Sequence, residues 1–218
     1  RIVQNTQAAL NGGTMNVNNL IVSADGTPRI ENIGIGVGAG GTAGVTGSVA
    51  VNMIANNVTA HIGNGANIVA DGSVGVVATS DEQIANYAGQ ASVAGSGAAV
   101  GLSVSYNELT GSTTATIDGD TTYVSASGNG DALKVKDSVA DNSILDDVVD
   151  EDAFDSQNTL GDYRVESEYN GVAVSASSTH AIKSFIINGG VAGTGAAVNG
   201  TVNVNQIGGQ SRYYRCGY

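Results

Sequence analysis

Three copies of one pattern decide the fold of this chain: GAGGTAGVTGSVAVN at Gly38–Asn52, VAGSGAAVGLSVSYN at Val93–Asn107 and VAGTGAAVNGTVNVN at Val191–Asn205. The second and third copies share nine of fifteen residues, among them Val and Asn as well as Gly and Ala. The segments that precede the three copies also align, as NLIVSADGTPRIEN, SVGVVATSDEQIAN and GVAVSASSTHAIKS. Self-similarity at a fixed offset is typical of a repeat architecture.

The spacing of the repeats indicates an insertion. Successive copies of the preceding segment lie 54 and 98 residues apart, and the difference of 44 residues falls between the second and third copies. We therefore predict solenoid units over residues 1–136, an acidic insertion over 137–168 and units of the same rod over 169–218. The chain begins with Arg1 and is interpreted as part of a longer protein.

Period-two alternation predicts strands rather than helices. Val100, Leu102, Val104 and Tyr106 alternate with Gly and Ser, a pattern that indicates strands with one face inside. Asn-Gly and Asp-Gly steps between the strands supply turns, because Gly and Asn tolerate positive φ. No helical pattern separates the strands of a unit, which excludes a doubly wound α/β sheet.

The fold predicted from these strands is all-β, a parallel β-helix whose successive coils stack on one another. A unit of 54 residues is too long for one coil, so we expect it to hold two or three. Val, Ile and Ala should fill the narrow interior, with Gly at tight corners. Asn52, Asn107 and Asn205 end equivalent segments and are predicted to bond between coils at a structural corner. A β-propeller, a β-sandwich and a trimeric β-roll remain as alternatives.

Composition excludes several classes of protein. Gly numbers 32 and Pro is a single residue, which excludes collagen, and charged residues make up only 13% of the chain. The net charge of −12 argues against nucleic acid or an anionic membrane as a partner. The run from Ile33 to Thr79 is too rich in Gly, Asn, Ser and Thr for a transmembrane helix, so no membrane insertion of this segment is expected. Cys216 is alone and forms no intrachain disulfide.

The insertion is the one irregular region. Asp137–Glu168 holds eleven of the twenty acidic residues and one basic residue, Arg164. Ile144, Leu145, Val148 and Val149 have helical spacing and predict a short helix. The acids Asp146, Asp147, Asp150 and Asp152 are weak candidates for calcium ligands. The EF-hand pattern is absent, so no cofactor is predicted beyond that one metal candidate.

No residue is predicted to be catalytic. His61 and His180 have no ligand-spaced His or Cys neighbour and are interpreted as surface side chains. Cys216 lies at a repeat position held elsewhere by Gly63 and Asp118, which argues against a reactive thiol. A polysaccharide-degrading β-helix enzyme needs paired carboxylates on one face, and only Asp118 and Asp120 outside the insertion come close. Ranks of Thr that would bind ice do not recur from unit to unit.

The units look like repeats of a known class of bacterial protein. AGGTAGVTGSVAVNMIANNVTAHIGNGANIVADGSVGVVATSDEQ and AGSGAAVGLSVSYNELTGSTTATIDGD resemble repeats of the large leukotoxin-type, filamentous-haemagglutinin-like adhesins of Gram-negative bacteria. The resemblance covers about 170 residues and lies in a Gly/Ala-Val run, a Val-x-x-Asn step and a Thr-x-Ala-x-Ile segment. It implies a right-handed β-helix, exported by a type V route and carried on the cell surface, and no catalytic residues. The segment Gln206–Tyr218 departs from the pattern.

The function expected from the sequence is that of a structural and adhesive segment of a repetitive surface adhesin. Its expected partners are host glycan or protein, or copies of itself. The main alternative is a subunit of a self-assembling extracellular filament that stacks end to end, and a weaker one is the β-helix enzyme.

Overall fold

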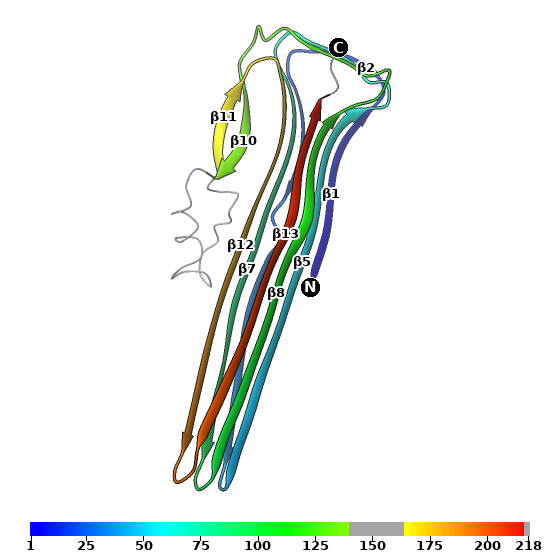
Figure 1. The fold of residues 1–218 in the computed structure, drawn as a ribbon. Coiled ribbons are helices and arrows are strands. Elements are labelled where there is room, and N and C mark those ends of the chain that lie inside the picture. Colours follow the sequence, from blue (N-terminus) through cyan, green and yellow to red (C-terminus); the bar gives the residue numbers. More distant parts are fainter. Residues whose placement is uncertain (140–163, 216–218) are drawn as a thin grey trace.

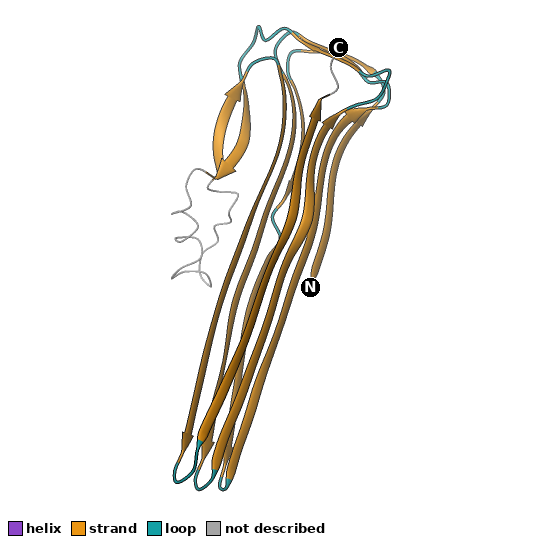
Figure 2. Cartoon of the chain, in the orientation of Figure 1, coloured by secondary structure: helices purple, strands orange, loops and turns teal. Residues whose placement is uncertain are grey.

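The computed structural model describes residues 1–139 and 164–215, and every regular element among them is a β-strand (Figures 1 and 2). The strands are β1 (Ile2–Asn11), β2 (Thr14–Val17), β3 (Leu20–Gly26), β4 (Arg29–Gly40), β5 (Ala43–Gly63), β6 (Asn67–Ala70), β7 (Val74–Ala94), β8 (Ala98–Ile117), β9 (Tyr123–Ala126), β10 (Leu133–Val139), β11 (Arg164–Tyr169), β12 (Val172–Ala192) and β13 (Ala197–Arg215). The all-β prediction is confirmed.

Each repeat of the sequence passes through three sheets in turn. Sheet A has the order β1-β5-β8-β13, and the short sheet B has the order β2-β6-β9. Sheet C has the order β3-β7-β12, with β4 also paired to β7. Every pair of neighbours in these three sheets is parallel, because equivalent strands of successive repeats lie side by side. This layered arrangement is consistent with a β-solenoid.

The register shows that one sequence repeat makes one layer. Ala43 of β5 faces Ala98 of β8 and Val74 of β7 faces Val172 of β12, which are the offsets seen in the sequence. The expectation of two or three coils per repeat is therefore wrong. The reason is strand length: β5 and β7 each span 21 residues, several times the usual strand of about 5 or 6.

The long strands form three stacked arches that we call the arm. Each arch runs down sheet C, through a tight Gly-containing turn, and back up sheet A, and the arches are residues 32–52, 86–107 and 184–205. The arm is the long lower end in Figure 1, and the rest of the three sheets forms the body at the upper end. Within an arch the two strands face each other through their side chains and hydrogen-bond to the neighbouring arches.

The body has the interior that the sequence predicts. A core of Val, Ile and Ala lies between the three sheets, and its members include Val58, Ile62, Ile68 and Val76, each 0% exposed. A smaller cluster beside the arm joins Ile54, Ile84 and Leu109. Burial of apolar surface contributes roughly 25 cal/mol per Å² removed from water, so both clusters stabilise the stack.

The insertion leaves the stack between β9 and β12. Its described part is not helical: β10 and β11 pair antiparallel as a two-stranded ribbon, and Val135 of β10 is buried. The predicted helix and the calcium candidates Asp146, Asp147, Asp150 and Asp152 lie in residues 140–163, outside the described residues.

Candidate functional site

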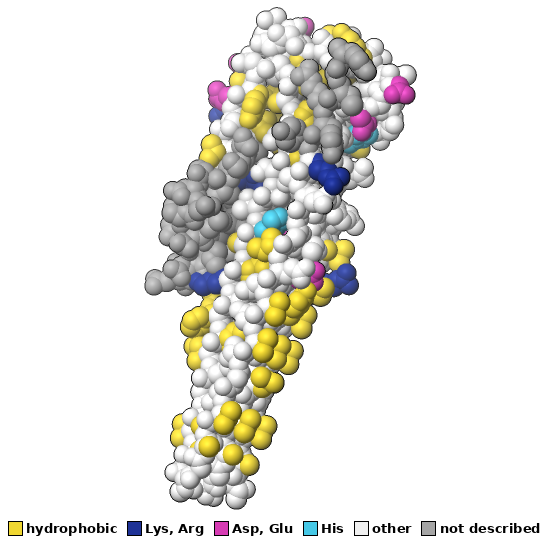
Figure 3. Space-filling model, viewed as in Figure 1, with side chains coloured by type: hydrophobic (Ala, Val, Ile, Leu, Met, Phe, Trp, Pro, Cys, Tyr) yellow, Lys and Arg dark blue, Asp and Glu magenta, His cyan; other side chains and the backbone are white. Residues whose placement is uncertain are grey.

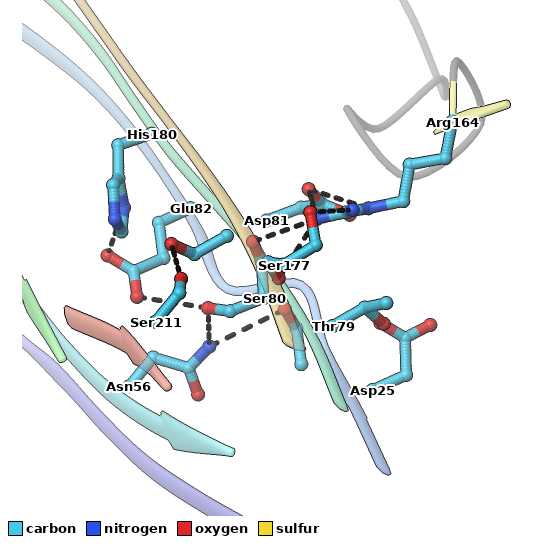
Figure 4. Close-up of polar contacts among 12 residues, drawn as sticks. Asp25, Asn56, Thr79, Ser80, Asp81, Glu82, Arg164, Ser177, His180 and Ser211 are labelled. Atoms are coloured by element: carbon cyan, nitrogen blue, oxygen red, sulfur yellow. Dashed lines mark hydrogen bonds and ion pairs between the residues drawn. The ribbon is translucent and has the colours of Figure 1, made fainter. Parts of the chain in front are cut away.

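A buried polar belt crosses the stack between the two apolar clusters of the body (Figure 4). Asn56 of β5 donates a hydrogen bond from Nδ2 to Ser80 Oγ of β7 at 2.8 Å. Ser80 in turn donates to Glu82 Oε1 at 3.2 Å. All three residues are 0% exposed, so these hydrogen bonds offset part of the cost of removing the groups from water, and Asn56 Oδ1 stays buried without a partner among the described residues.

The belt contains a carboxylate–imidazole pair between two layers. His180 Nδ1 of β12 lies 3.0 Å from Glu82 Oε2, in register with it. Glycines on the facing sheet make room: a Cβ at Gly209 would lie 2.6 Å from His180 Nε2, and one at Gly111 would lie 3.0 Å from Glu82 Oε1. The nearby Ser211 hydroxyl bonds to Ser178 Oγ at 2.7 Å. The prediction of His180 as a surface side chain is wrong, because it lies within β12 beside Glu82 and its side chain is 15% exposed.

A buried ion pair holds the insertion against the stack. Arg164 at the start of β11 donates from Nε to Asp81 Oδ2 at 2.9 Å and from Nη2 to Asp81 Oδ1 at 2.7 Å. Its Nη1 donates to Ser177 Oγ at 2.8 Å. Both charged side chains are 1% exposed. Asp81 and Glu82 are neighbours on β7, and Figure 4 shows their side chains on opposite faces of the strand.

Each buried carboxylate of this region already has a partner, the Arg164 guanidinium for Asp81 and the His180 imidazole for Glu82, and the Ser211 hydroxyl bonds to Ser178. The other histidine, His61, lies 2.7 Å from Asp118 Oδ1 of the adjacent layer. Within residues 1–139 and 164–215, no group of three or more His, Cys, Asp or Glu side chains is placed to hold a metal ion.

The predicted asparagines form a ladder inside the arm. Asn52 donates from Nδ2 to Asn107 Oδ1 at 2.8 Å, and Asn107 donates in the same way to Asn205 at 2.8 Å. The three residues lie within β5, β8 and β13, where those strands enter the arm, rather than at a corner of the chain. They bond from layer to layer along the stack.

The interior of the arm is polar. Asn86 donates to Ser105 Oγ and Ser103 donates to Asn188 Oδ1, both at 2.7 Å. The two sheets approach closely, since a Cβ at Gly36 would lie 2.8 Å from the Gly47 carbonyl oxygen. The interior therefore accepts Gly, Ser and Asn, and the predicted Val and Ile interior is wrong for this half of the molecule.

The large apolar side chains of the arm point outward. In the central arch, which has a neighbour on each side, Val100 and Leu102 are 40% and 53% exposed, while Ser103 and Ser105 are buried. Ile35 and Ile187 on the opposite side of the arm are 75% and 60% exposed. Figure 3 shows apolar side chains along the tapering lower end and no acidic or basic ones at its tip.

The sequence itself marks where the large apolar residues change from outward to inward positions. Along β5 the even-numbered positions up to Ile62 point inward, but the valines and isoleucines change from odd numbers, up to Val51, to even numbers, from Ile54. The same step occurs between Tyr106 and Leu109 of β8. A spacing of three between these large side chains, with Asn directly after the first, therefore marks the point where body becomes arm.

The chain was compared with protein families, curated proteins and solved structures. No protein-family model, no curated protein and no solved structure matches the chain. Among the described residues no helix is long and apolar enough to cross a membrane.

Proposed function

We propose that this chain is a non-catalytic segment of a right-handed β-solenoid rod, belonging to an adhesin on the surface of a Gram-negative bacterium. The observation that supports this most directly is the register between layers. Equivalent residues of successive repeats face each other over whole strands, and equivalent asparagines bond from layer to layer. Such a stack grows in one direction, by one layer of about 4.8 Å for each repeat added.

The charged groups support a structural role rather than turnover. The buried carboxylates Asp81 and Glu82 are each held by a cation or imidazole from another part of the chain. A polysaccharide hydrolase needs two carboxyl groups that reach a sugar from a cleft. Surface binding to host glycan or protein would instead use the repeated faces of the rod, each contact being weak and multiplied along its length.

Inserting one further layer tests the solenoid directly. A second copy of residues 43–97 placed between Gly97 and Ala98 supplies one complete layer, because Ala98 is the register equivalent of Ala43. We expect a cooperatively folded protein whose Tm is at least that of the natural chain. Small-angle X-ray scattering should show the stack lengthened by about 4.8 Å along its axis. An insertion of residues 43–84 is the matched control, since it ends halfway down the third strand and should disrupt folding. Failure of the full-layer insertion alongside the control would contradict the solenoid.

Adhesion and turnover are separated by a second measurement. The chain should be retained on immobilised glycans or matrix proteins and should release no product from pectin, hyaluronan or alginate. Glu82→Gln removes the one carboxylate–imidazole pair of the belt. Product release by the natural chain that is lost in E82Q would overturn the non-catalytic proposal.

The polarity of the asparagine ladder favours filament assembly as a second candidate. Each asparagine donates its amide N–H to the next layer, so Asn205 would donate to a further layer and Asn52 would accept from a preceding one. A second copy of the chain stacked end to end would supply both partners. Electron microscopy of the purified chain should then show fibres, and a Val202→Pro change in the outermost strand should shorten them. Fibres of unchanged length in V202P would contradict stacking through this edge.

A further inference from the structure

One side of the arm carries a continuous apolar surface that we call the C face. It consists of the outward side chains of the sheet C strands in the arm, namely Ile33, Ile35 and Val37 of β4, Tyr87, Ala91 and Val93 of β7, and Phe185, Ile187 and Val191 of β12. The register places Ile33, Tyr87 and Phe185 in one row across the three strands. The next row is Ile35, Gly89 and Ile187.

A groove runs through the centre of the C face. Gly89 has no side chain, so a slot lies between Ile35 on one side and Ile187 on the other, two strand spacings of about 4.8 Å apart. Tyr87 and Phe185 also line this hollow, whose volume is about 450 Å³ and whose lining is almost wholly apolar. Isoleucine ridges beside an empty slot have a shape that a second ridge of the same kind can fill.

Part of the exposure of the C face is independent of missing neighbouring strands. Val93 lies on β7, which is paired on both sides, and its side chain is still 45% exposed. The body half of the same sheet face is covered, because the β10–β11 ribbon packs there and is held by Arg164 and Asp81. Among residues 1–139 and 164–215, no element covers the C face, which continues a face that the ribbon covers in the body.

Charge and area favour a second copy of the chain as the occupant. The arm segments 32–52, 86–107 and 184–205 contain no Asp, Glu, Lys or Arg, although the chain carries a net charge of −12. Two copies can therefore approach through their arms without opposing like charges. Seven large apolar side chains of the C face are between 45% and 75% exposed, so the patch offers apolar surface for an interface, which typically takes about 800 Å² from each partner.

We propose that two copies of this chain pack the C faces of their arms together about a two-fold axis, each placing an isoleucine ridge in the Gly89 groove of the other. A two-fold arrangement uses the same patch on both copies and therefore closes at the dimer. The aromatic side chains beside the groove, Tyr87 and Phe185, are of a kind that is enriched at protein interfaces. This contact is independent of stacking along the rod and goes beyond the proposed function.

Sedimentation velocity of the intact chain over about 1 to 100 μM tests the proposal. We expect a monomer–dimer equilibrium in the natural chain. Ile187→Lys places a charge at the centre of the contact in both copies, and we expect it to raise the dimer Kd at least about 100-fold. Val49→Lys is the matched control, because Val49 is 76% exposed on sheet A, the opposite side of the arm. Both changes are on outward positions, so far-UV circular dichroism and Tm should match the natural chain at a concentration where the natural chain is monomeric.

The outcomes separate the possible occupants. A dimer that I187K abolishes and V49K preserves supports the proposal. A natural chain that is monomeric at 100 μM overturns it, as does a dimer that survives I187K or one that V49K abolishes. If the chain forms polymers of unlimited size and I187K does not change them, association occurs through the strand edges. This outcome also overturns the proposal. Binding of the monomer to neutral phosphatidylcholine vesicles, lost in I187K, assigns the C face to lipid and also overturns the proposal.

Discussion

The body and the arm are built from the same strands with opposite packing. β5 keeps one backbone face inward along its whole length, and Ile54 on that face is 0% exposed in the body. Three residues earlier, Val51 in the arm points outward and is 56% exposed, while Asn52 takes the interior position. The same backbone face of β5 points inward in both regions. The large apolar residues occupy outward positions in the arm and inward positions in the body. The comparison shows that sheet spacing, rather than alternation, decides which side is the interior.

The largest effect should come from the ion pair that exists only in the body. Arg164→Ala leaves Asp81 buried without its cation, and we expect the free energy of unfolding to fall by about 3–5 kcal/mol. Lys134→Ala is the control, because Lys134 lies 3.9 Å from Glu166 with both side chains more than half exposed, and it should cost less than about 1 kcal/mol. Urea unfolding of both variants measures the difference. Equal costs would contradict the buried role of Arg164.

One substitution made in both regions tests the reversal itself. Ile84→Ala removes a fully buried side chain beside the belt, and we expect a loss of about 2–5 kcal/mol. Ile35→Ala removes a side chain that is 75% exposed on the arm, and we expect a change within about 0.5 kcal/mol. Thermal unfolding at a concentration where the chain is monomeric gives both values. A cost for I35A similar to that for I84A would show that the arm packs conventionally.

The polar interior of the arm should matter less than the body core but measurably. Asn107→Ala leaves the amides of Asn52 and Asn205 without their shared partner, at a cost of about 1–3 kcal/mol. Asn57→Ala is the matched control, since Asn57 bonds to Asn5 at 2.9 Å on an exposed face, and it should stay within about 0.5 kcal/mol. Hydrogen exchange of arm amides in the two variants reports the local effect. Equal protection of the arm amides in N107A and N57A would contradict a stabilising role for the asparagine ladder.

The smallest effect is a titration where body and arm meet. Tyr106 donates a hydrogen bond to Glu108 Oε2 at 3.1 Å, and this bond, with burial and the nearby negative charge, raises the pKa of Tyr106 above its usual value of about 10. Because the folded pKa is raised, the contribution of this bond to stability is complete below pH 10 and is lost as the pH rises through the raised pKa. The difference between the natural chain and Tyr106→Phe in alkaline absorbance at 295 nm should show one late-titrating phenol. A phenol titrating at or below pH 10 would contradict the contact.

Much of the fold was predictable from the repeats, because equivalent residues of a stacked chain must face each other. The alignments of Val22 with Val76 and of Asn52 with Asn107 became the register of sheets C and A. The length of a layer was not predictable, since nothing in a short alternating segment states how far a strand continues. The buried residues Asp81, Glu82 and Arg164 were also missed. Their polar run Thr79–Gln83 interrupts a Val-rich strand, but the partners lie up to 98 residues away.

By itself the sequence determined the strand class, the offsets of the layers, the absence of charge from the arm and the asparagines that align between repeats. The tertiary structure decided which face of each strand is inside. An alternating pattern has the same period whichever face is buried, so the distance between the two sheets decides which face lies inside. In the arm, Gly36 and Gly38 let the sheets approach until a Cβ at Gly38 would lie 2.6 Å from the Val45 carbonyl oxygen. No aliphatic side chain fits there, and the valines and isoleucines are left on the outer surface.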